Sequence, residues 1–158
     1  MLIKADRSGS FAYAKYIKEA YYMEIPALTG NELEIMELLW REERPLSRSE
    51  IIELTPERSW SERSIHILLN SLLEKQAIEV GGFVRTNKNY GRTFVPLIAR
   101  EDYIVSAVNQ MKQSLSGTSK KSPVTAIFAA LVQDKDIDDT ELDELERMIA
   151  ERRNRNKG

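Results

Sequence analysis

One stretch of the sequence places hydrogen-bonding side chains at helical spacing. Between Trp60 and Ile78, apolar residues recur at i, i+3, i+4 and i+7, which predicts a helix with one buried stripe. The opposite face carries groups that can bind base edges in a DNA major groove. These groups belong to Arg63, His66, Ile67, Asn70 and Ser71. An ordinary amphipathic core helix remains the alternative interpretation of this stretch alone.

Two more helix starts precede this stretch and indicate how it is positioned. Residues 29–32 and 47–50 both have the pattern of a capping box, in which a hydroxyl and a glutamate three residues later satisfy free amides. Ser61 is a good N-cap for the third helix and lies where it can also contact DNA. The second helix should end at Thr55, because the residue before Pro56 avoids the helical conformation. Three short helices with tight links predict a helix-turn-helix core.

A β-hairpin is predicted directly after the third helix. Residues 78–80 and 83–85 favour strands with Gly81 and Gly82 between them, and residues 92–95 favour a returning strand. A hairpin in this place is a wing, which can contact phosphates or a minor groove. Its expected DNA-binding residues are Lys88, Tyr90 and Arg92. A solvated hairpin without a ligand is the alternative.

The last third of the sequence predicts helices without a core of their own. Helical patterns cover residues 100–115 and begin again at Ser122 and Asp138, and residues 116–122 have the composition of a linker. The two helices after the linker carry apolar stripes that one chain does not bury, so we expect a second copy to cover them. The expected dimerisation residues are Ile127, Phe128, Leu131, Leu142, Leu145 and Ile149.

The predicted organisation has three parts and a mainly α-helical fold with a small β-hairpin. Residues 1–27 form an N-terminal extension, either an ordered accessory helix or a dispensable segment. Residues 28–98 form a winged helix-turn-helix DNA-binding domain, and residues 99–158 form a helical dimerisation region. The net charge of −2 argues against tight DNA binding by one copy, although bases outnumber acids between residues 60 and 95. We therefore expect a homodimer on double-stranded DNA.

Composition excludes several classes of site. The chain has no cysteine, which removes disulfides and thiolate metal sites, and its single histidine, His66, leaves no metal cluster or histidine-assisted triad. Residues 134–138 alternate aspartates as in a calcium loop, but Asp139 and Leu145 occupy the required glycine and glutamate positions. We expect no catalytic residues, no metal and no cofactor, and thus no enzyme.

The sequence also argues against a membrane partner. Its longest uncharged run, residues 122–133, is too short to span a bilayer. No basic start followed by an apolar segment and a small-residue cleavage site is present, so secretion is not expected. We expect a cytoplasmic protein.

Taken together, three blocks of the sequence resemble the penicillinase-repressor family of winged-helix transcriptional regulators. The blocks cover residues 28–40, 45–51 and 60–72, and residues 138–149 are similar to the tail of that family. The resemblance implies a homodimeric repressor that binds an inverted-repeat operator. It also implies that the helix over residues 61–75 enters the major groove and that the C-terminal helices dimerise. A winged-helix protein-interaction module without sequence-specific DNA binding is the alternative.

The sequence departs from this family at several positions. Relatives often carry arginine in place of Ser71 and a hydroxyl residue in place of Ile67, and the wing of this chain is longer. Copper-responsive relatives have a C-terminal cysteine motif that this chain lacks. Relatives released by proteolysis are cut at an Asn-Phe bond, where this chain has Ala130 and Leu131. The DNA-binding class therefore carries over, whereas we expect another inducing signal than β-lactam-triggered cleavage.

Overall fold

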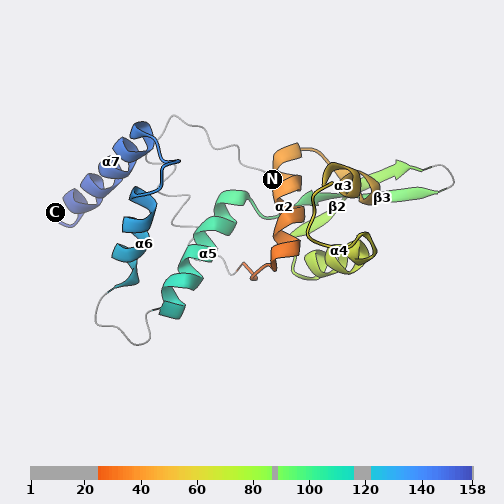
Figure 1. Cartoon of the computed structure of the whole chain (residues 1–158), viewed down its shortest axis with the longest axis horizontal. Helices are drawn as coiled ribbons and strands as arrows, with labels where there is room; N and C mark the ends of the chain where they lie inside the picture. Colours follow the sequence, from red (N-terminus) through yellow and green to blue (C-terminus); the bar gives the residue numbers. More distant parts are fainter. Residues whose placement is uncertain (1–24, 87–88, 116–121, 158) are drawn as a thin grey trace. The chain divides into compact units, whose positions relative to one another are not determined.

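The computed structural model describes residues 25–86, 89–115 and 122–157, and these form a mainly helical fold with a small antiparallel sheet (Figure 1). The predicted fold class is thereby confirmed. The described residues belong to two compact units, an N-terminal unit that ends at Asn109 and a C-terminal unit that begins at Gln110. The elements are α2 (Gly30–Glu42), β1 (Leu46–Ser47), α3 (Arg48–Leu54), the 3₁₀ turn η1 (Glu62–Ser64), α4 (Ile65–Glu74), β2 (Ile78–Arg85), β3 (Tyr90–Pro96), α5 (Arg100–Leu115), α6 (Pro123–Val132) and α7 (Asp139–Arg155).

Most of the expected extension over residues 1–27 lies outside the described residues, as does Lys88. The expected division into residues 28–98 and 99–158 stays a prediction. Helix α5 extends across the division between the two units, since its last turns follow Asn109.

The predicted capping boxes begin α2 and α3. The Thr29 amide donates to Glu32 Oε2 at 2.7 Å, and the Glu32 amide donates to Thr29 Oγ1 at 3.3 Å. Ser47 and Glu50 make the same two bonds at 2.8 and 3.3 Å. These reciprocal bonds satisfy amides that no helical carbonyl can reach, so each helix begins at a defined residue. As predicted, α3 ends before Thr55.

The third helix differs from the predicted single α-helix at its start. Ser61 caps the 3₁₀ turn η1 by accepting from the Arg63 amide at 3.3 Å, and the α-helical bonds of α4 begin only at Ile65. Tight 3₁₀ turns are common at the ends of α-helices. The cap is therefore where the sequence predicted it, but it starts a tighter turn.

The sheet has the strand order β1-β3-β2 and is antiparallel throughout. Strand β1 was not predicted, and its two residues pair with Phe94 and Thr93 of β3. Strand β2 is continuous where two separate segments were expected, with a bulge between Val80 and Gly82. A Cβ at Gly81 would lie 2.8 Å from Val95 Cγ1, and Gly82 has a φ of +155°. The two glycines thus permit a bulge within one strand.

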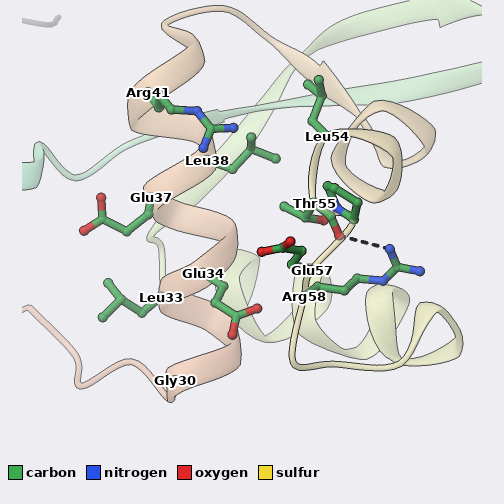
Figure 2. Close-up of a pocket in the computed structure, with 11 residues that line it drawn as sticks. Gly30, Leu33, Glu34, Glu37, Leu38, Arg41, Leu54, Thr55, Glu57 and Arg58 are labelled. Carbon is green, nitrogen blue, oxygen red and sulfur yellow. Dashed lines mark hydrogen bonds between the residues drawn. The ribbon is translucent and has the colours of Figure 1, made fainter.

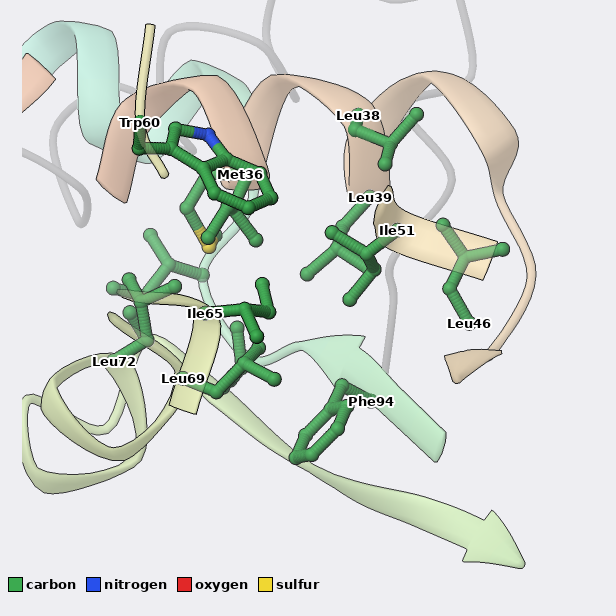
Figure 3. Close-up of a cluster of buried hydrophobic side chains, with 14 of the residues drawn as sticks. Met36, Leu38, Leu39, Leu46, Ile51, Trp60, Ile65, Leu69, Leu72 and Phe94 are labelled. Carbon is green, nitrogen blue, oxygen red and sulfur yellow. The ribbon is translucent and has the colours of Figure 1, made fainter. Parts of the chain in front are cut away.

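The core of the N-terminal unit joins α2, α3 and α4 to the sheet (Figure 3). Its central side chains come from α2, β1, α3, α4 and β3. They include Met36, Leu39, Leu46, Ile51, Ile65, Leu69, Leu72 and Phe94, each at most 2% exposed. Trp40 of α2 donates to the Ile98 carbonyl at 2.8 Å and lies 5.9 Å from the Tyr103 ring, which fixes the start of α5. The buried stripe that the sequence predicted for this helix is therefore part of a closed core, with Ile65, Leu69 and Leu72 as its α4 members.

The C-terminal unit has no such core. None of the described side chains of residues 122–157 is buried, although Ser122 and Asp138 cap α6 and α7 as predicted. Among the expected dimerisation residues, Leu131 is 48% and Ile149 is 40% exposed. The other four are half-buried, namely Ile127, Phe128, Leu142 and Leu145. In the part of the chain that the structure describes, no helix combines the length and apolar character needed to cross a membrane.

Candidate nucleic-acid interface

The outer face of η1 and α4 is an exposed stripe on a helix that is fixed from behind. Arg63, His66, Ile67 and Asn70 are exposed at i, i+3, i+4 and i+7, and Ile67 is 72% exposed. The inner face is anchored by Ile65, Leu69 and Leu72 in the core. We call the four exposed residues the recognition stripe. A large aliphatic side chain between hydrogen-bonding groups is suited to binding a surface that is itself part polar and part apolar.

Ser71 corrects the expectation that it lies on this exposed face. Its side chain is half-buried, and its hydroxyl donates to Glu32 Oε1 at 2.6 Å. Its place among polar residues of the helix was predictable, but its contact with a buried carboxylate on α2 was not. The structure therefore does not group Ser71 with the recognition stripe.

The carboxylate of Glu32 connects the start of α2 to the end of α4. Glu32 is 2% exposed, and Oε2 also accepts from Lys75 Nζ at 2.7 Å. Burial raises its pKa, but hydrogen bonds from Lys75, Ser71 and Thr29 outweigh burial and hold the pKa at about 2. Lys75 also donates to the Ala27 carbonyl at 3.0 Å. This network holds the end of α4 against the start of α2, so it orients the recognition stripe.

Arg48 lies beside the recognition stripe and was not among the residues predicted for the site. It is the first residue of α3, it is exposed, and its Nη1 lies 2.7 Å from His66 Nε2. Arginine can only donate, so this contact requires the tautomer of His66 in which Nε2 is the acceptor. Arg48 thereby adds a cation beside the recognition stripe. The feature of the sequence that could have identified Arg48 is its place at the start of α3, the helix that precedes α4.

The hairpin formed by β2 and β3 carries the other expected contacts. Tyr90 is 74% exposed, and Arg92 is exposed with its guanidinium 5.6 Å from the centre of the Phe94 ring. The structure therefore places both side chains at the surface of the wing. Since Lys88 lies outside the described residues, its predicted role stays a prediction.

Cations without acidic partners gather on these elements. Among the described residues, the guanidiniums of Arg48, Arg63, Arg85 and Arg92 form no ion pair. Some arginines of the same unit are paired, as Arg100 is with Glu37 at 3.1 Å. These four guanidiniums lie on α3, η1 and the hairpin, so this part of the N-terminal unit presents more positive charge than the net charge of −2 of the whole chain indicates.

A surface groove lies between α2 and the segment after α3 (Figure 2). Its charged side chains are largely used by the fold. Arg58 donates to the Ile52 and Thr55 carbonyls at 3.2 and 3.1 Å, and Glu37 pairs with Arg100. Within the described residues, no cluster of histidine, aspartate or glutamate is arranged to hold a metal ion. The charged side chains of the groove therefore stabilise the segment that leads into η1, and we do not assign a catalytic role to them.

Three core helices, a three-stranded antiparallel sheet and a hairpin after the exposed helix define a winged helix-turn-helix protein. Residues 28–151 match the model of the penicillinase repressor family, and the chain belongs to this family of DNA-binding transcriptional repressors. The predicted family and functional class are confirmed.

Individual relatives are similar at low identity. The penicillinase repressor of Bacillus licheniformis is 26% identical over 137 residues, which cover 85% of this chain and 98% of that protein. The solved adhesin competence repressor of Streptococcus pyogenes is 11% identical with a TM-score of 0.35, covering 94% of this chain and 93% of its own. The solved Staphylococcus aureus MarR, in complex with salicylate and kanamycin, is 12% identical with a TM-score of 0.38, covering 89% and 82%.

Proposed function

We propose that this repressor is a homodimer that binds an inverted-repeat operator and reads it with the recognition stripe of α4. The observation that carries the proposal is that Arg63, His66, Ile67 and Asn70 are exposed together on a helix whose other face is buried. A recognition helix needs this combination, because the side chains must reach base edges while the backbone stays fixed. A role limited to protein contacts does not require hydrogen-bonding groups at this spacing.

Three members of the stripe have chemical counterparts in the major groove. Arginine can donate two bonds to guanine, asparagine can pair with the donor and acceptor of adenine, and an aliphatic side chain can pack on the thymine methyl. Arg63, Asn70 and Ile67 are assigned these roles. Arg48 and Arg92 are assigned to phosphates, since contacts to the DNA backbone fix the position of a protein on its site.

The dimer is supported by the apolar side chains of the C-terminal unit. Helix α6 exposes Val124, Leu131 and Val132, and helix α7 exposes Met148 and Ile149, each by 37–49%. Several exposed apolar side chains on adjacent elements favour association with a partner. A second copy of the same unit is a partner that can cover these side chains on both chains at once. Dimerisation makes binding of the second half-site intramolecular, which raises the affinity for the full operator by a factor of about 10²–10⁴ over that for a half-site.

The test is a gel-shift titration against the DNA upstream of the gene, with random DNA of equal length for comparison. Ile67→Ala and Asn70→Ala should each lower the free energy of discrimination between the two DNAs by about 1–3 kcal/mol, because each removes a base contact. Gln113→Ala, an exposed neutral substitution on α5, is the control and should leave discrimination unchanged. Equal losses of affinity for both DNAs would contradict sequence recognition by this face.

A further inference from the structure

The side chains of Arg48 and His66 meet beside the recognition stripe, and their contact depends on the charge of the imidazole. Arg48 Nη1 lies 2.7 Å from His66 Nε2, which connects the start of α3 to the first turn of α4. A guanidinium can only donate, so the contact uses the lone pair of Nε2. An imidazolium carries a proton on both ring nitrogens and has no lone pair left for this contact. The observed pair is therefore a state of the neutral imidazole.

The pair contains the single histidine of the chain. Histidine is the side chain whose charge changes between about pH 5 and pH 8. The two carboxylates of the first capping boxes, Glu32 and Glu50, have pKa values of about 2 and stay charged throughout this range. A proton can therefore act on the Arg48–His66 pair while the caps of α2 and α3 remain intact.

A proton on His66 would place a cation among other cations. Arg48 contacts the ring, and Arg63 lies three residues earlier, at the spacing of one helical turn. Glu62 is the acidic side chain of this turn, and its Oε2 lies 3.8 Å from Arg58 Nη2. The charge of a protonated ring is thus balanced only in part, by one carboxylate that a second cation shares.

Acidic side chains of the other elements around α4 are placed away from the imidazole. On α2, Glu32 contacts α4 at its opposite end, and on α3, Glu50 is held by the cap of that helix. Glu53 lies five residues after the first residue of α3 and so on another side of it, and exposed Glu79 follows a buried residue on β2 and points to the other side of the sheet. On β3, Arg92 adds a cation over a buried phenylalanine of the core. Phosphates of bound DNA are anions that can balance a protonated ring.

We propose that the Arg48–His66 pair couples operator binding to the uptake of a proton. In the free protein the neutral imidazole accepts from Arg48. On DNA the ring takes a proton from solvent, the hydrogen bond to the guanidinium breaks, and both cations bind backbone phosphates. The inference rests on the proposed function and adds a dependence on pH to it. Because coupling between two ligands is reciprocal, acid should strengthen DNA binding, and DNA should favour the protonated ring.

The experiment measures the affinity for operator and for random DNA against salt, at about pH 5.5 and about pH 8, on either side of the range in which histidine changes charge. The slope of log affinity against log salt should be steeper in acid by about 1 for each bound chain, as expected for one added phosphate contact. Binding should be tighter in acid, and this advantage should shrink about threefold per chain between about 50 and 200 mM salt.

His66→Gln is the decisive variant, because glutamine offers Arg48 an amide oxygen but cannot gain a charge. Its salt slope should be the same at both pH values. The double variant His66→Gln, Gln113→His is the matched control, since it returns a histidine to the chain at an exposed position of α5. It should also show one slope. A slope that steepens in acid for either variant would overturn the inference.

The contact itself can be tested without DNA. Imidazole nitrogen signals in an NMR spectrum belong to His66, because the chain has a single histidine. At about pH 8 the wild type should show Nε2 as the unprotonated nitrogen, whereas Arg48→Ala should leave the ring free to populate both tautomers. A wild-type ring that carries its proton on Nε2 would exclude the contact and overturn the inference.

The inference and the proposed function fail in different ways. Operator discrimination with the same wild-type salt slope at both pH values, or with weaker binding in acid, would overturn the proton coupling and leave the proposed function standing. A slope that steepens in acid only when His66 is present, combined with unchanged discrimination in Ile67→Ala and Asn70→Ala, would support the coupling and contradict base recognition by the stripe.

Discussion

The two units of this chain use the same helical periodicity to different ends. In the N-terminal unit, apolar stripes of α2, α3 and α4 converge with Phe94 on a core in which Leu39, Ile51 and Ile65 have no exposed surface. In the C-terminal unit, α6 and α7 carry comparable stripes, yet Leu131 and Ile149 are 48% and 40% exposed. An apolar stripe identifies the side of a helix that must be covered, and only the contacts show whether the same chain covers it. The first unit is complete in one chain, and the second is suited to a partner.

The largest expected effect separates these two kinds of apolar residue. Leu39→Ala should lower the free energy of unfolding of the N-terminal unit by about 2–5 kcal/mol, because it leaves a cavity in a closed core. Leu131→Ala should leave the unfolding of that unit unchanged and weaken self-association. Urea titration measures the first effect, and sedimentation over a range of concentrations measures the second. A similar loss of stability from both changes would remove the distinction between the units.

The next largest effect is the loss of stability of the N-terminal unit in acid, which depends on two of its carboxylates. The pKa of Glu32 is about 2 in the fold against an ordinary value of 4.5, so its stabilising contribution is complete above about pH 4.5 and is lost as pH falls through about 2. Glu50 behaves alike, because the Ser47 amide and then Arg44 hold its pKa at about 2. The free energy of unfolding of the N-terminal unit should therefore fall between about pH 5 and pH 2.

Glu32→Gln makes the acid prediction specific. The neutral side chain should lower stability at pH 7 by about 1.5–3 kcal/mol, the value of a hydrogen bond to a charged group, with the lower end favoured because Lys75 is partly exposed. The variant should also lose less stability on acidification than the wild type. Glu57→Gln, at an exposed residue, is the control. An unchanged dependence on pH in Glu32→Gln would show that the buried network does not couple α2 to α4.

The smallest expected effect concerns Arg48. Arg48→Ala should weaken binding to operator and random DNA alike and should reduce the slope of log affinity against log salt by about 1, as expected for one lost phosphate contact. Arg100→Ala is the matched control, because that guanidinium is paired with Glu37. Loss of discrimination without a change of salt slope would instead assign Arg48 to base recognition through His66.

Features that depend on neighbouring residues were predictable, and those that depend on distant ones were not. The capping boxes at Thr29 and Ser47 follow from four-residue patterns, and the buried side of α4 follows from its periodicity. Strand β1 exists only because β3 pairs with it, nearly fifty residues further along the chain, so no local pattern marks it.

The same distinction between local and distant partners applies to the residues of the candidate site. The recognition stripe was predicted because exposure follows from the position of the apolar stripe on the same helix. Ser71 was assigned to the wrong environment because its partner, Glu32, lies on another helix, and Arg48 was missed because it reaches His66 across the turn between two helices. Polar residues take their role from tertiary contacts, and periodicity records only apolar burial.

The central claim is that the N-terminal unit recognises DNA and the C-terminal unit mediates dimerisation. Separating the two units tests this claim most directly. A fragment truncated after Ser119 retains the core of the N-terminal unit and loses α6 and α7. The fragment should sediment as a folded monomer and bind a full operator hardly better than a half-site. The intact chain should bind the full operator more tightly than a half-site by a factor of about 10²–10⁴. A fragment that forms a stable dimer, or that keeps the full preference for two half-sites, would contradict the division of roles between the units.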